Sequence, residues 1–140
     1  MRHAGRVIDA LWMLLAVAVC AGLYWLAFRI EPHYSSRDGR RFVCAGQFID
    51  AQGQPEGRIT EFRAVLLEDN LVEVSRRHRL RRRSAKFQLL ARAPNLSRRR
   101  AVYLLRAADP EALGDQLTLR MPPQSRTSKL FDHVLAERGR

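Results

Sequence analysis

The longest apolar run in the chain extends from Ala10 to Phe28, nineteen residues without a charged side chain. At a helical rise of ~1.5 Å per residue it spans about 28 Å, close to the ~30 Å hydrocarbon core of a bilayer. This run predicts a single transmembrane helix. The N-terminal part of the chain then divides into a tail (1–9), a transmembrane helix (10–29) and a polar juxtamembrane linker (30–41).

A cleaved secretory signal is the alternative for this segment, because the chain also begins with arginines before the apolar run. The run is longer than the roughly 7–15 residues of a typical signal core, and no small-x-small cleavage site precedes a polar start. The stretch ending at Cys20 resembles a lipoprotein cleavage box. The bulky Val19 and the apolar residues after Cys20 argue against cleavage, so an uncleaved anchor is predicted.

Beyond residue 41 the pattern changes to short β-rich segments separated by turns. The alternation is clearest in 58–67, where Phe62, Ala64 and Leu66 share one face, whereas 102–105 is apolar throughout and predicts burial on both faces. The segments predict strands at 42–50, 58–67, 71–74, 86–91, 101–106 and 116–121.

A final amphipathic helix is predicted over about 125–138. Pro122 and Pro123 end the preceding strand, and Ser125 or Thr127 can cap the helix. The apolar residues form one stripe, which implies that the helix lies against the sheet. The stripe consists of Leu130, Phe131, Val134 and Leu135.

This element order predicts an α+β chain. One N-terminal transmembrane helix precedes a small antiparallel β-barrel or sandwich at 42–138, which the C-terminal helix closes. Strands followed by a closing helix resemble the pleckstrin-homology-like superfold. The overall plan also resembles uncharacterised single-span membrane proteins of actinobacteria, a resemblance that implies no activity.

The charge balance points to a membrane-proximal, cytoplasmic domain. The chain has 25 lysines and arginines against 14 acidic residues, a net charge of +11. Four arginines lie within 29–41 and two within 1–9, so the positive-inside bias places the C-terminal domain in the cytoplasm, at the cell membrane. Cys44 is the only cysteine outside the apolar run, which fits a reducing compartment.

The sequence carries little that indicates an enzyme. It has no glycine-rich phosphate loop, no HExxH and no CxxC, and no histidine has a second ligand at metal spacing. We therefore predict no catalytic residue, metal or cofactor. A thiol enzyme using Cys44 with His78 or His133 is a third, disfavoured hypothesis, because a cysteine in an apolar strand is usually an inert core residue.

The most distinctive feature is a run of twelve cations without an acid between Glu73 and Asp109. Arginine binds phosphate through two parallel hydrogen bonds, so these clusters are candidates for binding anionic lipid headgroups or an acidic protein partner. Nucleic acid is disfavoured because no aromatics are interleaved with the run. The candidates are Arg76, Arg77, Arg79, Arg81, Arg82, Arg83, Arg98, Arg99 and Arg100.

The leading functional hypothesis is a non-enzymatic, single-pass membrane-anchored binding or scaffold protein. The alternative is a small accessory subunit of a larger membrane complex, in which the arginines serve as a topology signal or a solvated surface. Ala18 and Gly22 have the small-xxx-small spacing that allows helix packing in membranes. The oligomeric state is left open.

Overall fold

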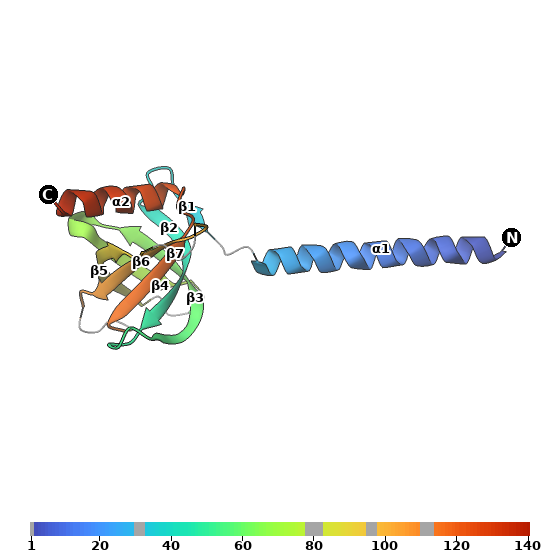
Figure 1. The fold of residues 1–140 in the computed structure, drawn as a ribbon, viewed down its shortest axis with the longest axis horizontal. Coiled ribbons are helices and arrows are strands. Elements are labelled where there is room, and N and C mark those ends of the chain that lie inside the picture. The colour runs from blue at the N-terminus through green and yellow to red at the C-terminus, as the bar shows by residue number, and fades with distance from the viewer. Residues whose placement is uncertain (1, 30–32, 78–82, 95–97, 110–113) are drawn as a thin grey trace. The chain divides into compact units, whose positions relative to one another are not determined.

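The computed structural model describes residues 2–29, 33–77, 83–94, 98–109 and 114–140. Internal contacts divide the chain into two units, Met1–Glu31 and Pro32–Arg140. The first unit is one long helix, and the second contains the strands and the C-terminal helix (Figure 1).

The N-terminal helix α1 is Arg2–Arg29, so the residues predicted as a tail continue the helix. Within α1, Val7–Ala27 is long and apolar enough to cross a membrane. Its large apolar side chains are exposed, for example Leu14 at 68% and Trp12 at 67%. An apolar surface of this extent needs to be covered. A membrane anchor and a signal sequence both have this length and composition.

The second unit contains a closed barrel of six antiparallel strands, β2 to β7. Strands that follow one another in sequence pair with one another, and β2 also pairs with β7, which closes the sheet. A short strand β1 extends the sheet beside β2. The strands are β1 (Tyr34–Ser35), β2 (Arg41–Ile49), β3 (Pro55–Leu66), β4 (Leu71–Arg76), β5 (Ser84–Arg92), β6 (Ala101–Ala107) and β7 (Gln116–Met121), with a 3-10 turn η1 at Glu68–Asn70.

The barrel core is built by the alternation of inward and outward side chains along each strand. In β3, Phe62, Ala64 and Leu66 are at most 4% exposed, which confirms their predicted shared face. The buried residues of the core cluster all come from β2 to β7 and from the C-terminal helix. We therefore expect Pro32–Arg140 to fold without α1.

Strand β6 differs from its predicted burial. Tyr103 and Leu105 are fully buried, but Val102 and Leu104 are only half-buried. They lie on the outer face of the closed barrel, where no second sheet formed by described residues covers them. The prediction of burial on both faces was therefore wrong.

The C-terminal helix α2 (Arg126–Arg138) lies across one end of the barrel (Figure 1). Of the two predicted capping residues, Ser125 caps the helix by accepting a hydrogen bond from the Ser128 backbone N–H at 3.1 Å. Phe131 is fully buried, with its ring edge-on to Phe42 at 5.4 Å and to Tyr103 at 5.1 Å. The rest of the predicted stripe also packs against the core, namely Leu130, Val134 and Leu135.

A buried polar network joins α2 to the barrel wall. The Tyr103 hydroxyl lies 2.6 Å from Ser128 Oγ and donates to Asp132 Oδ1 at 2.8 Å. Asp132 Oδ2 accepts from Arg92 Nη1 at 2.7 Å. Burial raises the pKa of Tyr103 to about 12; the Ser128 hydrogen bond opposes this and the Asp132 carboxylate adds to it. Because buried polar groups require partners, we expect this network to hold α2 in one position on the barrel.

The segment predicted to be a linker contributes β1 to the sheet. Tyr34 pairs with Val43 of β2. The Thr127 hydroxyl, fully buried at the start of α2, lies 2.8 Å from Ser35 Oγ and donates to the Gly39 carbonyl at 2.9 Å. The polar side chains of this segment therefore take part in the folded unit.

Candidate functional site

Arg76, at the start of the predicted basic run, is the last residue of β4 and is half-buried. Val72 and Val74 point inward along β4, so the same alternation directs Arg76 toward the core. Its guanidinium carbon lies 5.4 Å from the ring centroid of Phe48, a cation–π contact. Its Nε is buried without a hydrogen-bond partner among the described residues. Arg76 is thus half-buried, with its guanidinium directed toward the core at Phe48.

Arg77 has the opposite orientation and already has an acidic partner. Its Nη1 lies 2.9 Å from Glu61 Oε2 on β3. A partly exposed pair of this kind contributes at most about 1 kcal/mol. Arg83 is exposed just before β5, whereas the predicted site residues Arg79, Arg81 and Arg82 lie outside the described residues.

The second arginine cluster lies at the other end of β5. Arg98, Arg99 and Arg100 are exposed and lead into β6. The nine residues of β5 separate them from the described arginines of the first cluster, Arg76, Arg77 and Arg83. At ~3.3 Å per residue, the length of β5 is roughly 30 Å. The sequence allowed the two clusters to share one face, but the fold places their described members at opposite ends of β5.

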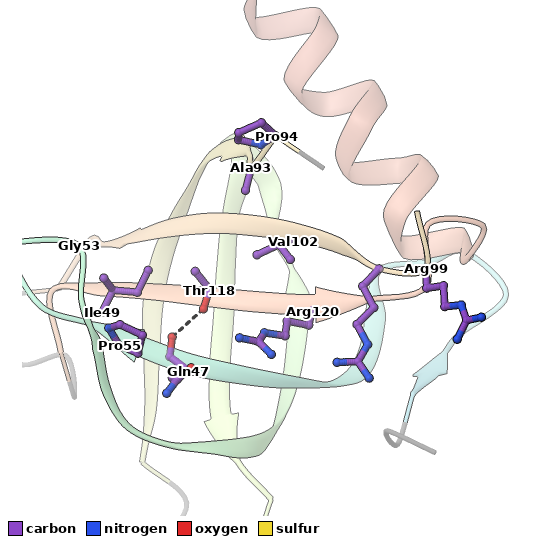
Figure 2. Close-up of a pocket in the computed structure, with 11 residues that line it drawn as sticks. Gln47, Ile49, Gly53, Pro55, Ala93, Pro94, Arg99, Val102, Thr118 and Arg120 are labelled. Atoms are coloured by element: carbon purple, nitrogen blue, oxygen red, sulfur yellow. Dashed lines mark hydrogen bonds between the residues drawn. The ribbon is translucent and has the colours of Figure 1, made fainter. Parts of the chain in front are cut away.

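Arg99 and Arg100 line a groove of about 530 Å³ on the outer face of the barrel. The groove crosses β2, β7 and β6, between the β2–β3 turn and the end of β5. Figure 2 shows Arg120 lying along this face with its guanidinium toward Gln47. The lining residues are Gln47, Ile49, Gly53, Pro55, Ala93, Pro94, Arg99, Arg100, Val102, Thr118 and Arg120.

The floor of the groove is held by the seam that closes the barrel. The Thr118 hydroxyl donates to the Gln47 carbonyl at 3.0 Å across β2 and β7 (Figure 2). The Gln47 side-chain amide donates to the Gly57 carbonyl at 2.9 Å. Val102 stands opposite Arg120 in the register of β6 and β7. These bonds fix the groove's polar groups, and apolar side chains fill the spaces between them.

Arg120 is the charged residue of this site that was not predicted from the sequence. It is half-buried on β7, and in the described part of the chain no acidic side chain pairs with it. The signal was present in the alternation of 116–121, which places Gln116, Thr118 and Arg120 on the outward face. The predicted candidates all came from the arginine clusters within 76–100, and Arg120 lies outside them.

The other titratable groups do not form a reactive cluster in the parts of the chain that the structure describes. Cys44 is fully buried in the core, and His133 is exposed on α2 with its Nε2 3.1 Å from Glu137 Oε1. Burial lowers the pKa of His33. No group of three metal-ligating side chains occurs among the described residues.

The helix-packing candidates Ala18 and Gly22 lie on the surface of α1. Ala18 and Gly22 lie one turn apart on one face and are exposed. A Cβ added at Gly22 would meet nothing within 4 Å.

No family model, no curated protein and no solved structure matches this chain. Its function is therefore inferred from its own geometry and charge.

Proposed function

We propose that the protein is a non-enzymatic, single-pass membrane-anchored binding protein whose cytoplasmic β domain contacts anionic lipid headgroups. The observation that carries this proposal is the outer-face groove, where Arg99, Arg100 and Arg120 line a largely apolar floor. Guanidinium groups match phosphate geometry, and an apolar floor next to them suits an amphiphile. The helix Val7–Ala27 would tether the domain to the bilayer.

The net charge supports the same partner. With a charge of +11, the chain is attracted to the anionic cytoplasmic leaflet, where each nearby cation contributes about 1 kcal/mol before screening. A tether also keeps the domain at high effective concentration near that surface, so a weak site is sufficient. The order of strands followed by a C-terminal helix is consistent with the pleckstrin-homology-like resemblance, which stays a prediction.

Membrane orientation is the first part of this proposal to test. A C-terminal reporter active only in the cytoplasm should give a signal, because the arginine excess follows the span. A reporter active only on the outer side should be silent. A signal only from the outer reporter would refute the cytoplasmic assignment.

Flotation with lipid vesicles tests the binding itself. The fragment should begin at Pro32, because β1 and its contact with Thr127 belong to the folded unit. We expect flotation with vesicles containing phosphatidylserine, little with pure phosphatidylcholine, and weakening as salt is raised. Equal binding to both vesicles, or no binding to either at low salt, would refute the proposed binding of anionic headgroups. An acidic protein that co-purifies with the full chain would then favour the accessory-subunit alternative.

A further inference from the structure

We propose that the groove over β2, β7 and β6 binds a single anionic phospholipid, with its phosphate on Arg120 and its glycerol and acyl region on the apolar floor. This inference rests on the proposed function and assigns it a specific site. It assigns lipid binding to one pocket and not to the whole basic surface. The central cation of this pocket, Arg120, lies outside the cation-rich stretch between Glu73 and Asp109.

The position of Arg120 favours it as the phosphate ligand. Its side chain is half-buried and lies over the sheet toward Gln47 (Figure 2). A partly buried charge is screened less by salt than an exposed one. Arg99 and Arg100 are exposed and already engage other groups of the chain, so they add positive potential at the rim. The guanidinium of Arg120 can therefore present two parallel N–H donors to one phosphate.

The apolar floor distinguishes a lipid from a free phosphate. A volume of about 530 Å³ lies within the range of small-molecule pockets and exceeds what a bare anion needs. Ile49, Pro55 and Val102 form apolar parts of the floor beside Gln47 and Thr118 (Figure 2). Inorganic phosphate cannot use these side chains, whereas the glycerol and the first acyl carbons of a lipid can cover them.

The closed sheet argues against an acidic peptide as the occupant. Each strand under the groove already has a paired strand on both sides, with β7 between β2 and β6. A peptide could not add to this sheet as a further strand and would lose the main-chain hydrogen bonds of that binding mode. A lipid needs none of them.

The test uses the full-length protein in a neutral maltoside detergent, with lipid adducts quantified by native mass spectrometry. The probes are phosphatidylglycerol and phosphatidylcholine with identical acyl chains, glycerol phosphate, and inorganic phosphate. The variants are Arg120→Gln, Val102→Thr and the control Arg63→Gln, which removes the same charge from an exposed position on β3 outside the groove. Matching thermal unfolding curves would verify that all variants are folded.

We expect the wild-type protein to bind phosphatidylglycerol in preference to the other probes. Arg120→Gln should weaken this binding by about tenfold, the scale of one lost charge-assisted bidentate contact. Val102→Thr keeps the side-chain shape and makes the floor polar, so it should weaken the lipid more than glycerol phosphate. Arg63→Gln should change the affinity by less than about twofold.

The possible failures can be told apart. Equal weakening by Arg63→Gln and Arg120→Gln would mean that diffuse charge attracts the lipid, which overturns the groove assignment and leaves the proposed function intact. Binding of inorganic phosphate as tight as that of phosphatidylglycerol would overturn the lipid assignment. No preference for phosphatidylglycerol over phosphatidylcholine would overturn both the groove assignment and the proposed function.

Discussion

Replacing Tyr103 by phenylalanine tests whether the buried network holds α2 on the barrel. The substitution keeps the ring, which contacts Phe131 with a centroid distance of 5.1 Å, and removes only the hydroxyl. That hydroxyl lies 2.6 Å from Oγ of the fully buried Ser128 and donates to Asp132 Oδ1 at 2.8 Å. Its loss leaves Ser128 Oγ without this partner, whereas Asp132 keeps its pair with Arg92.

The expected cost follows from these contacts. Leaving a buried polar group without its partner costs about 1–3 kcal/mol. Since Asp132 stays paired with Arg92, we expect the free energy of unfolding to fall by about 2 kcal/mol, or roughly 8–12 °C in melting temperature for a domain of this size. Urea unfolding of the 32–140 fragment, followed by far-ultraviolet circular dichroism, measures this. Both tryptophans lie in α1, so tryptophan fluorescence is unsuitable.

Two comparisons make this result specific. Tyr34→Phe, at a side chain that is 62% exposed, should change the free energy of unfolding by less than about 0.5 kcal/mol. Tyr103→Phe combined with Ser128→Ala should cost less than the sum of the single variants, because the two hydroxyls interact. If Tyr103→Phe is as mild as Tyr34→Phe, the hydroxyl network does not hold α2.

The remaining predictions concern pH, the helix cap and the barrel seam. In the unfolded chain a tyrosine ionises near pH 10, whereas burial keeps Tyr103 protonated in the folded state up to about pH 12. The contribution of Tyr103 to the free energy of unfolding is therefore complete below pH 10 and falls between pH 10 and 12. Tyr103→Phe should flatten that part of a curve of stability against pH, measured by urea unfolding. Ser125→Ala should lower the free energy of unfolding by about 1 kcal/mol, and Ser125→Asp, which can still cap, should restore most of it; equal losses would exclude capping as the cause. Gly46→Ala places a Cβ 2.8 Å from the Thr118 carbonyl oxygen and 2.9 Å from Phe62 Cδ2, so urea unfolding should show a loss of about 1–3 kcal/mol, whereas Gly139→Ala, with its nearest contacts at 3.8 Å, should be almost neutral.

Local patterns determined which elements form and which of their faces are buried. Residues of alternating polarity make a half-buried strand because successive side chains point to opposite sides of the backbone. This is why Phe62, Ala64 and Leu66 were assigned correctly from the sequence. The helix cap at Ser125 and the apolar stripe of α2 were equally predictable, because both depend on residues within a few positions of one another.

The two-residue strand β1 could not be found in this way. Two residues are too few to show a period, and β1 exists because Tyr34 and Ser35 pair with β2. The hydroxyl of Thr127, some ninety positions later in the chain, then lies beside Ser35. Pairing across such a distance depends on the complete barrel and leaves no local pattern.

The candidate site also has some features that the sequence determined and others that only the tertiary structure decided. The sequence alone determined that the chain has one apolar run long enough for a membrane, a strongly basic β domain, and arginines concentrated around β5. Only the tertiary structure decided that Arg76 faces the core, that Arg77 pairs with Glu61, and that Arg120 lies beside Arg99 and Arg100 in a groove. The physical reason is that alternation determines a side chain's face, whereas its neighbours on that face depend on strand register and barrel closure, which join residues far apart in the sequence.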